Sequence, residues 1–426
     1  MNDHIYKRIQ QSNSFIGEYM RSLDTLETPL AYDFWTAAWV VSTIVGRRTQ
    51  VARPRIPVFL NLFAILIGES GLARKGASIA SATQLVKMMA NTNMTRHIGV
   101  IDSRITPTSI TRYLTELSQE YGYAQLAFSA AELAASIGKD QRVGSVPILL
   151  TDLYDCPDDR LLRPSFSKVD VQLRNIYVSF LGASTSSWLR SAVSADIVEG
   201  GFTSRCLFIL GNKRKRVIAW PDASRSIGDG TITARLCSID QQADQTAGID
   251  LNVSAREYFV NWYNQRRIYS DSFRASFAGR EDSHVLRIAA IMCISDDMWQ
   301  IQQQHIVDAI ALITQVRDDG AVLFEFANKT HMTRHERLIL RAKERLIAEG
   351  SVGIKYRDFA ARLRPFSGVD IQQVLDAMIK LRMVQRFIIP NKTGPSTTIL
   401  RATTLLTGIA ADYAILRELT GEERHY

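Results

Sequence analysis

The chain has 426 residues, 46% of them hydrophobic and 22% charged, which is enough to bury a core and predicts about two or three domains. Its four cysteines are scattered without a Cys-x-x-Cys pair, and its seven histidines form no ligand cluster. These counts argue against a disulfide scaffold or a zinc site and favour the cytoplasm. The longest early apolar stretch, residues 34–45, is too short to cross a bilayer, so we expect a buried helix there and no membrane partner.

The net charge of +8 is concentrated in one block of the chain. Residues 333–402 hold fourteen Lys and Arg against six Asp and Glu, and the rest of the chain is balanced. Confined basic charge is typical of a nucleic-acid-binding module. A solvated basic face without a ligand is the alternative.

The first part of the chain is predicted to contain a helical segment followed by a buried strand. Residues 1–50 read mainly as helices, with Pro29 separating two of them, and we expect a role in packing or subunit contacts. Residues 59–67 form a continuous apolar run, which is typical of a strand buried in a parallel sheet.

A glycine loop follows this strand. It contains Gly68, Gly71 and Gly76 and carries Lys75, before a helix predicted over residues 79–90. A strand, a glycine loop with a lysine, and a helix form the order that a phosphate-binding loop requires. Backbone N–H groups, the helix N-terminus and the lysine all attract an anion.

The loop departs from the usual G-x-x-x-x-G-K-[ST] pattern. Counted from Gly68, Lys75 comes one residue late, and Ala73 stands at the second glycine. No Ser or Thr follows Lys75 directly, and the nearest hydroxyl is Ser78. A simple glycine turn between a core strand and a helix is the alternative interpretation.

The string Gly-x-Ser-Gly-x-Ala-Arg-Lys-Gly-x-Ser resembles the variant P-loop of an ATPase family from phages, plasmids and integrated elements. Those proteins are often fused or adjacent to primases and are similar to ring-forming replicative helicases. The resemblance extends over about residues 29–327. It implies that the loop binds ATP with Mg²⁺, with Ser78 as a metal ligand. The residues implied in ATP binding are Gly68, Ser70, Gly71, Arg74, Lys75, Gly76 and Ser78.

Residues 123–133 form a second apolar strand, which ends in Glu132. In ATPases of this class, a carboxylate at the end of the strand beside the P-loop activates water or holds Mg²⁺, and the resemblance gives both roles to Glu132. Ala131 stands where an Asp is usual, so Glu132 would act alone or with Asp152 or Asp155. A surface glutamate at a helix start is the alternative.

Residues 175–185 form another buried strand, which ends in Ser184 and Thr185. Thr185, or Ser184, resembles the sensor of the terminal phosphate, and a helix cap at Thr185 is the alternative. Gly-Phe-x-x-Arg at residues 201–205 resembles the family's arginine finger, so we expect Arg205 to complete the site of a neighbouring subunit. The finger implies a homo-oligomer, as a hexameric ring, whereas a structural ion pair is the alternative.

A linker is predicted over residues 221–245. Residues 249–326 read as helices that resemble the family's lid, where Arg287 or Arg280 is a second nucleotide sensor or part of a lid-core salt bridge. Before them lies a basic loop for which we predict DNA phosphate contacts, a solvated loop being the alternative. Its residues are Lys213, Arg214, Lys215 and Arg216.

The basic C-terminal block has its own pattern. Helix, helix, helix and hairpin is the order of a winged helix, whose third helix enters a major groove, although such domains also serve protein contacts. The predicted helices are residues 335–349, 356–363 and 367–381, and the predicted strands are residues 383–390 and 397–402. We predict DNA contacts for Lys380, Arg382 and Lys392.

We therefore expect an AAA+-like P-loop α/β core of three layers, with a helical lid and a winged helix. The expected function is an ATP-hydrolysing, ring-forming DNA motor, a replicative helicase of a mobile element, with a primase or another replication protein as a further partner. One alternative is an ATP-switched initiator or helicase loader without unwinding activity, and another is a degenerate ATPase that serves as a scaffold or in defence. The expected boundaries are a helical segment 1–50, a core 51–222, a lid 223–330, a winged helix 331–405, and a helix and tail 406–426.

Overall fold

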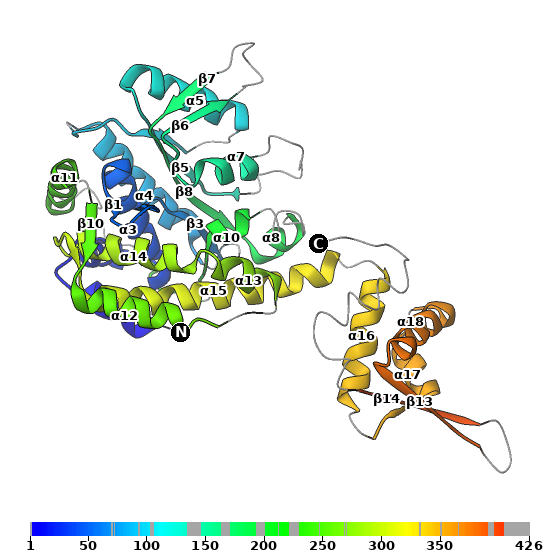
Figure 1. Cartoon of the computed structure of the whole chain (residues 1–426). Coiled ribbons are helices and arrows are strands. Elements are labelled where there is room, and N and C mark those ends of the chain that lie inside the picture. Colours follow the sequence, from blue (N-terminus) through cyan, green and yellow to red (C-terminus); the bar gives the residue numbers. More distant parts are fainter. Residues whose placement is uncertain are drawn as a thin grey trace. The chain divides into compact units, whose positions relative to one another are not determined.

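The fold comes from a computed structural model, in which the chain forms two compact units, Met1–Ala327 and Asn328–Tyr426 (Figure 1). The division lies three residues before the boundary expected from the sequence. The structure describes residues 2–403 except residues 70, 72, 93, 103–105, 134–145, 163–170, 193–200, 212, 221–229, 247, 268, 270, 332–333, 350–351, 365 and 391–395. The predicted C-terminal helix and tail lie outside the described residues.

Three helices open the first unit: α1 (Asp3–Gln11), α2 (Phe15–Ser22) and α3 (Leu30–Val45). Helix α3 starts directly after Pro29, and all but its first two residues are buried, which confirms the buried helix predicted from the apolar run. It packs against α4 (Lys75–Ala90) and β8 (Ile176–Ser184). The N-terminal segment is therefore part of the body of this unit.

A five-stranded sheet lies at the centre of the first unit, and the structure is thus α/β, as expected. All of its strands run parallel and helices flank it (Figure 1). Its apolar strands bury side chains on both faces, as in other parallel sheets. The strand order is β4 (Gly99–Ile101), β5 (Ala124–Ala130), β8, β3 (Phe63–Ile67) and β9 (Leu207–Leu210).

The strand register aligns the carboxyl ends of three strands. Ile67 of β3 pairs with Ser184 of β8, and Gly182 of β8 pairs with Ala130 of β5. Strand β8 separates β5 from β3, so the expectation that the strand before Glu132 lies beside the loop strand is wrong. Chain order does not reveal this arrangement, because strand order depends on pairing between distant segments.

The remainder of the first unit corrects two predictions. Residues 230–245 are a helix, α11 (Gly230–Gln245), although a linker was expected, because apolar residues including Leu236 and Ile239 recur on one buried face. The predicted lid helices do not form a separate body. Among them α14 (Glu281–Ser295) is almost wholly buried and packs against α3 and the short strand β2.

Further helical elements belong to this unit. They are η1 (Leu23–Thr25), η2 (Gly46–Arg48), α5 (Pro107–Tyr121), α7 (Val146–Leu153), α8 (Ser186–Ala192), α10 (Phe202–Arg205), α12 (Val253–Asn264), α13 (Ser272–Ala278) and α15 (Gln303–His331). Strands β6 (Asp159–Leu162) and β7 (Val171–Arg174) pair with each other. A second sheet has the order β11 (Gln300–Ile301), β10 (Gly248–Leu251), β1 (Gln50–Val51) and β2 (Val58–Phe59).

The second unit contains the three helices and two longer strands predicted from the sequence. Its core includes Leu338 and Leu346 of the first helix, and Val374 and Met378 of the third. The strands form an antiparallel sheet of order β12, β14, β13, in which the short β12 was not predicted. The elements are α16 (Arg334–Ala348), β12 (Ile354–Lys355), α17 (Tyr356–Arg362), α18 (Gly368–Lys380), β13 (Val384–Ile389) and β14 (Thr397–Ala402).

None of the helices in the described part of the chain is both long and apolar enough to cross a bilayer.

Candidate functional site

The glycine loop connects β3 to α4, and Lys75 is the first residue of that helix. The helix thus begins four residues earlier than predicted, which places the lysine at its positive end. Lys75 Nζ donates to the carbonyl oxygen of Gly68 at 2.5 Å and to that of Glu69 at 3.2 Å. Partial burial lowers the pKa of Lys75. The ammonium group is therefore held over the loop, where it can meet an anion.

Two positions in this loop have a left-handed backbone. Gly71 has a φ of +74° and Arg74 has a φ of +49° directly before the helix. Such a conformation favours glycine, so Arg74 has a backbone conformation that glycine adopts more easily in a turn of this kind. No described atom lies within 4 Å of a Cβ built on Gly71 or on Gly76. The loop therefore presents an open backbone surface of the kind that phosphate groups occupy.

Gly68 serves a different purpose at the base of the loop. A Cβ at this position would come within 2.7 Å of Ala73 Cβ and of the Tyr32 hydroxyl. The same hydroxyl donates to the carbonyl oxygen of Ile67 at 2.7 Å. Gly68 is thus required for packing against α3, and Ser70 lies outside the described residues.

Thr185 lies beside the start of the loop, because β8 and β3 are neighbours. The Gly68 N–H donates to the Ser184 carbonyl oxygen at 3.3 Å, which fixes the two strand ends together. Thr185 Oγ1 accepts from the Trp188 N–H at 3.2 Å and so caps α8. The capping role, which was the alternative, is therefore observed. Thr185 is half-buried and also lies next to the candidate phosphate loop.

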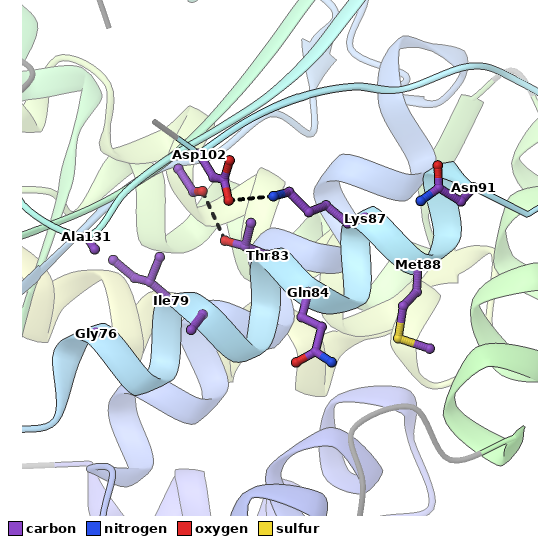
Figure 2. A pocket seen from close by; sticks show the side chains of 11 residues that line it. Gly76, Ile79, Thr83, Gln84, Lys87, Met88, Asn91, Asp102 and Ala131 are labelled. Carbon is purple, nitrogen blue, oxygen red and sulfur yellow. Dashed lines mark hydrogen bonds and ion pairs between the residues drawn. The ribbon is translucent and has the colours of Figure 1, made fainter. Parts of the chain in front are cut away.

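Glu132 follows β5 by two residues, at the same edge of the sheet as the loop, and its side chain is exposed. Its neighbour Ala131 lines a cavity of 460 Å³ that extends along α4 and includes Gly76 (Figure 2). The cavity therefore connects the helix N-terminus with the end of the acidic strand.

Polar residues that the sequence analysis did not select line this cavity (Figure 2). Lys87 Nζ lies 2.5 Å from Asp102 Oδ2, and Thr83 Oγ1 donates to Ser129 Oγ at 3.0 Å. Asp102 directly follows β4, so a carboxylate after an apolar strand was the signal that could have identified it.

The expected Mg²⁺ ligands fit only in part. Ser78 is wholly buried, and its Oγ has no hydrogen-bond partner among the described residues. Because Ser78 is fully buried, it does not fit as a ligand of an ion in the open loop, whereas the exposed Glu132 side chain is accessible to an ion. Among the described residues, no three His, Cys, Asp or Glu side chains gather into a metal site.

Arg205 lies near the amino ends of the parallel strands, opposite the carboxyl ends where the loop is, because it comes two residues before the start of β9. Strand β3 is five residues long, about 16 Å, so Arg205 cannot reach the loop of its own subunit. Its side chain is only 13% exposed, and its guanidinium lies 3.6 Å from Asp155. It also donates to the Gly201 carbonyl oxygen at 2.9 Å. In this conformation Arg205 makes the structural ion pair that was the alternative to a finger.

Asp155 is consequently not a partner of Glu132. It pairs with Arg205 and, at 3.3 Å, with Arg280, at the edge away from the loop. Asp152 pairs with Arg160 at 2.9 Å.

Arg287 is a buried structural residue, so its assignment as a nucleotide sensor is wrong. It is 4% exposed and donates to the Phe59 carbonyl oxygen at 2.8 Å and to the Tyr154 hydroxyl at 2.7 Å. His284 lies beside it and bonds the Ser204 carbonyl oxygen through Nε2 at 2.9 Å. Burial and the Arg287 charge lower the pKa of His284 to about 3. The sequence could not show that α14 is buried on all sides.

The basic loop after β9 is bound to the N-terminal helices, which argues against its predicted role as a free DNA contact. The side chain of Lys215 is 4% exposed, and its Nζ lies 2.6 Å from the fully buried Asp33 side chain. Arg216 pairs with Asp24 at 3.1 Å, whereas Lys213 is exposed. Lys215 in particular cannot contact DNA, because its ammonium group lies inside the first unit.

Arg214 links the basic loop to the glycine loop. It donates to the Gly71 carbonyl oxygen at 3.3 Å and to Glu27 Oε2 at 3.1 Å. The same Glu27 oxygen accepts from Arg74 Nε at 2.9 Å. Hydrogen bonds from Ile218 and Arg74 lower the pKa of Glu27. Glu27 was not predicted as a site residue, and no local pattern marks it, since its partners are far away in the chain.

A second cavity, of 350 Å³, lies at this side of the loop. Gly211 at the end of β9 and Arg214 line it together with residues from α1 and α15, such as Tyr6 and Asp319. The Gly211 N–H donates to the Ile67 carbonyl oxygen at 2.9 Å, so the cavity begins at the base of the glycine loop.

In the second unit, Lys380 ends α18 and the exposed Arg382 follows it with a φ of +59°. Lys392 lies outside the described residues. Comparison with protein-family models and with curated proteins finds no match for the chain.

Proposed function

We propose that the first unit binds and hydrolyses ATP at the loop around Lys75. The observation that carries the proposal is the position of Lys75, at the N-terminus of α4 and over an open glycine loop at the carboxyl edge of a parallel sheet. Backbone amides, a helix N-terminus and a lysine attract polyphosphate when they meet at one point. Three strand ends meet at this edge, so groups from different segments can act on one ligand.

Each residue of this edge has a proposed role. Lys75 and the amides near Gly71 and Gly76 hold the phosphates, and Thr185 lies where a hydroxyl can contact the terminal one. Glu132 orients the attacking water, because its exposed carboxylate is next to the cavity at Gly76. The cavity at Gly211, on the other side of the loop, is the place we propose for the nucleoside.

We further propose an AAA+-like, ring-forming assembly. Strand β8 lies between the loop strand β3 and the acidic strand β5, so the residues that follow all three strands can act together on one nucleotide. Arg205 is too far from its own loop, so it can act on a nucleotide only from a neighbouring subunit, after leaving Asp155. The basic second unit supports a DNA partner. Together with the resemblance of the glycine loop, it leads us to propose a replicative helicase of a mobile element.

One specific observation favours a second candidate, an ATP-switched initiator or helicase loader that does not unwind DNA. Gly76 follows Lys75 where P-loop enzymes have the hydroxyl that holds Mg²⁺, and Ser78 is buried. A site that binds ATP but hydrolyses it slowly suits an assembly switch better than a motor.

Mixing two inactive variants tests the shared site. Lys75→Ala removes phosphate binding, and Arg205→Ala removes the group supplied to the neighbour. If the site is shared, each variant alone is inactive, and the mixture regains part of the ATP turnover, because a Lys75→Ala subunit can supply Arg205 to an intact loop. A mixture as inactive as its components would contradict action between subunits. Unwinding of a forked duplex by the wild type then separates the motor from the loader.

A further inference from the structure

A cavity in the second unit gathers three arginines. It measures 410 Å³ and is lined by Arg341, Glu344 and Arg345 of α16 and by Arg362, the last residue of α17. The three residues of α16 are spaced so that they share one face of the helix. The opposite face is apolar and buried in the core of the unit, so the arginine face is turned outward.

Two of these arginines are not held in ion pairs in the part of the unit that the structure describes. Neither Arg341 nor Arg345 makes an ion pair with a described carboxylate, and both are exposed. The Arg341 guanidinium lies 5.7 Å from the centre of the Phe366 ring, and Arg362 is held by Glu349 at 2.6 Å. Three guanidinium groups thus face two carboxylates, Glu344 and Glu349, and the cavity keeps a positive charge.

Helix α18, which is predicted to enter a major groove, lacks such an excess. Its charged residues are Asp370, Asp376 and Lys380, so it carries one more acidic than basic residue. Helix α16, in contrast, has five basic and two acidic residues. Phosphate contacts depend on positive charge, so the charge of this unit points to α16 and α17 rather than to α18.

We propose that the cavity of Arg341, Arg345 and Arg362 binds phosphate groups of a nucleic-acid backbone. Guanidinium groups donate two parallel hydrogen bonds to a phosphate, and the fixed partners of Arg341 and Arg362 orient their guanidinium groups. Such contacts hold the duplex in place without reading its sequence. The inference takes from the proposed function only the choice of nucleic acid as the partner.

Binding of the full chain to a fluorescent duplex of mixed sequence, measured over a range of salt concentrations, tests this site. The test variant is Arg341→Gln/Arg345→Gln, and Lys380→Gln/Arg382→Gln removes the same charge at the end of α18. We expect the test variant to lose at least about tenfold in affinity and to lower the salt slope by about two, since each phosphate contact contributes about 0.9. The α18 variant should lose less, and Glu344→Gln should bind more tightly.

Two results would overturn the proposal. One is an equal or larger loss in the Lys380→Gln/Arg382→Gln protein, which would place the contact at α18. The other is unchanged DNA affinity together with lost binding of a polyglutamate peptide, which would identify a surface for acidic proteins. Circular dichroism checks that each variant is folded. Failure of the ATP proposal is seen separately, as ATP turnover that Lys75→Ala leaves intact.

Discussion

The Lys215→Met variant tests the conclusion that the ammonium group of Lys215 lies in the protein interior and not at a DNA contact. Lys215 Nζ lies 2.6 Å from Asp33 Oδ2 and donates to the Leu23 carbonyl oxygen at 2.7 Å. Asp33 is fully buried, and its other oxygen accepts from Thr28 Oγ1 at 2.6 Å. Methionine fills a similar volume but leaves the carboxylate without its counter-charge. Loss of one partner of a buried pair costs about 3–5 kcal/mol of unfolding free energy.

The expected cost depends on pH in a defined direction. Burial raises the pKa of Asp33 to about 7, above its ordinary value of 3.8. A carboxyl with a raised pKa loses stability as pH rises from its unfolded to its folded pKa, and without Lys215 the folded pKa rises further. Above about pH 7, ionisation of Asp33 no longer lowers the unfolding free energy of the wild type. In the variant it continues to lower it, by up to about 1.4 kcal/mol per pH unit. The full cost is therefore expected at pH 8 and a smaller one at pH 6.

Urea unfolding at both pH values measures this difference. Lys213→Met is the matched control, because Lys213 is exposed in the same loop, and its effect should stay within about 0.5 kcal/mol. Adding Asp33→Asn to Lys215→Met should restore part of the stability, since it removes the buried charge. If Lys215→Met unfolds at the wild-type urea concentration and loses DNA affinity instead, Lys215 is not in the interior.

Two further predictions concern α14. When the pH falls from 7.5 to 4.5, the wild type should lose about 2–3 kcal/mol more unfolding free energy than His284→Gln, as measured by urea unfolding. The reason is that the folded pKa of about 3 lies below the ordinary 6.5, so stability present above pH 6.5 is lost as pH falls; an equal loss would contradict a buried neutral His284. Arg287→Met should cost about 3–5 kcal/mol, because the Tyr154 hydroxyl and the Phe59 carbonyl lose their donor, while ATP affinity of the folded protein stays unchanged. A stable variant with weakened ATP binding would restore the sensor assignment.

Local patterns in the sequence predicted the elements of the central sheet. Apolar runs predicted β3, β5 and β8, and the glycines after β3 predicted the turn into α4. Strand order was not predictable, because it depends on which distant segments pair. The same limit explains the missed Asp102, which joins the site only once β4 and β5 are adjacent.

Basic residues were the least predictable part of the site. Four consecutive cations in the chain indicate a solvated or phosphate-binding loop, yet Lys215 and Arg214 pair with Asp33 and Glu27, far away in sequence. Arg287 matched a family pattern, but helices and short strands surround α14, so the Arg287 guanidinium is satisfied internally. Spacing selected Lys75 as a candidate, and the structure places it where the pattern predicted, at the junction of the loop and α4.

Equilibrium binding of a fluorescent ATP analogue to the wild type and to Lys75→Ala tests the central claim most directly. Lys75 Nζ can exchange its bonds to Gly68 and Glu69 for charge-assisted bonds to phosphate, each of which contributes about 1.5–3 kcal/mol. We predict saturable binding that unlabelled ATP displaces, and a loss of about tenfold to a hundredfold in Lys75→Ala with an unchanged urea midpoint. A wild type that does not bind the analogue, or a Lys75→Ala protein that binds it equally well, would contradict the nucleotide site.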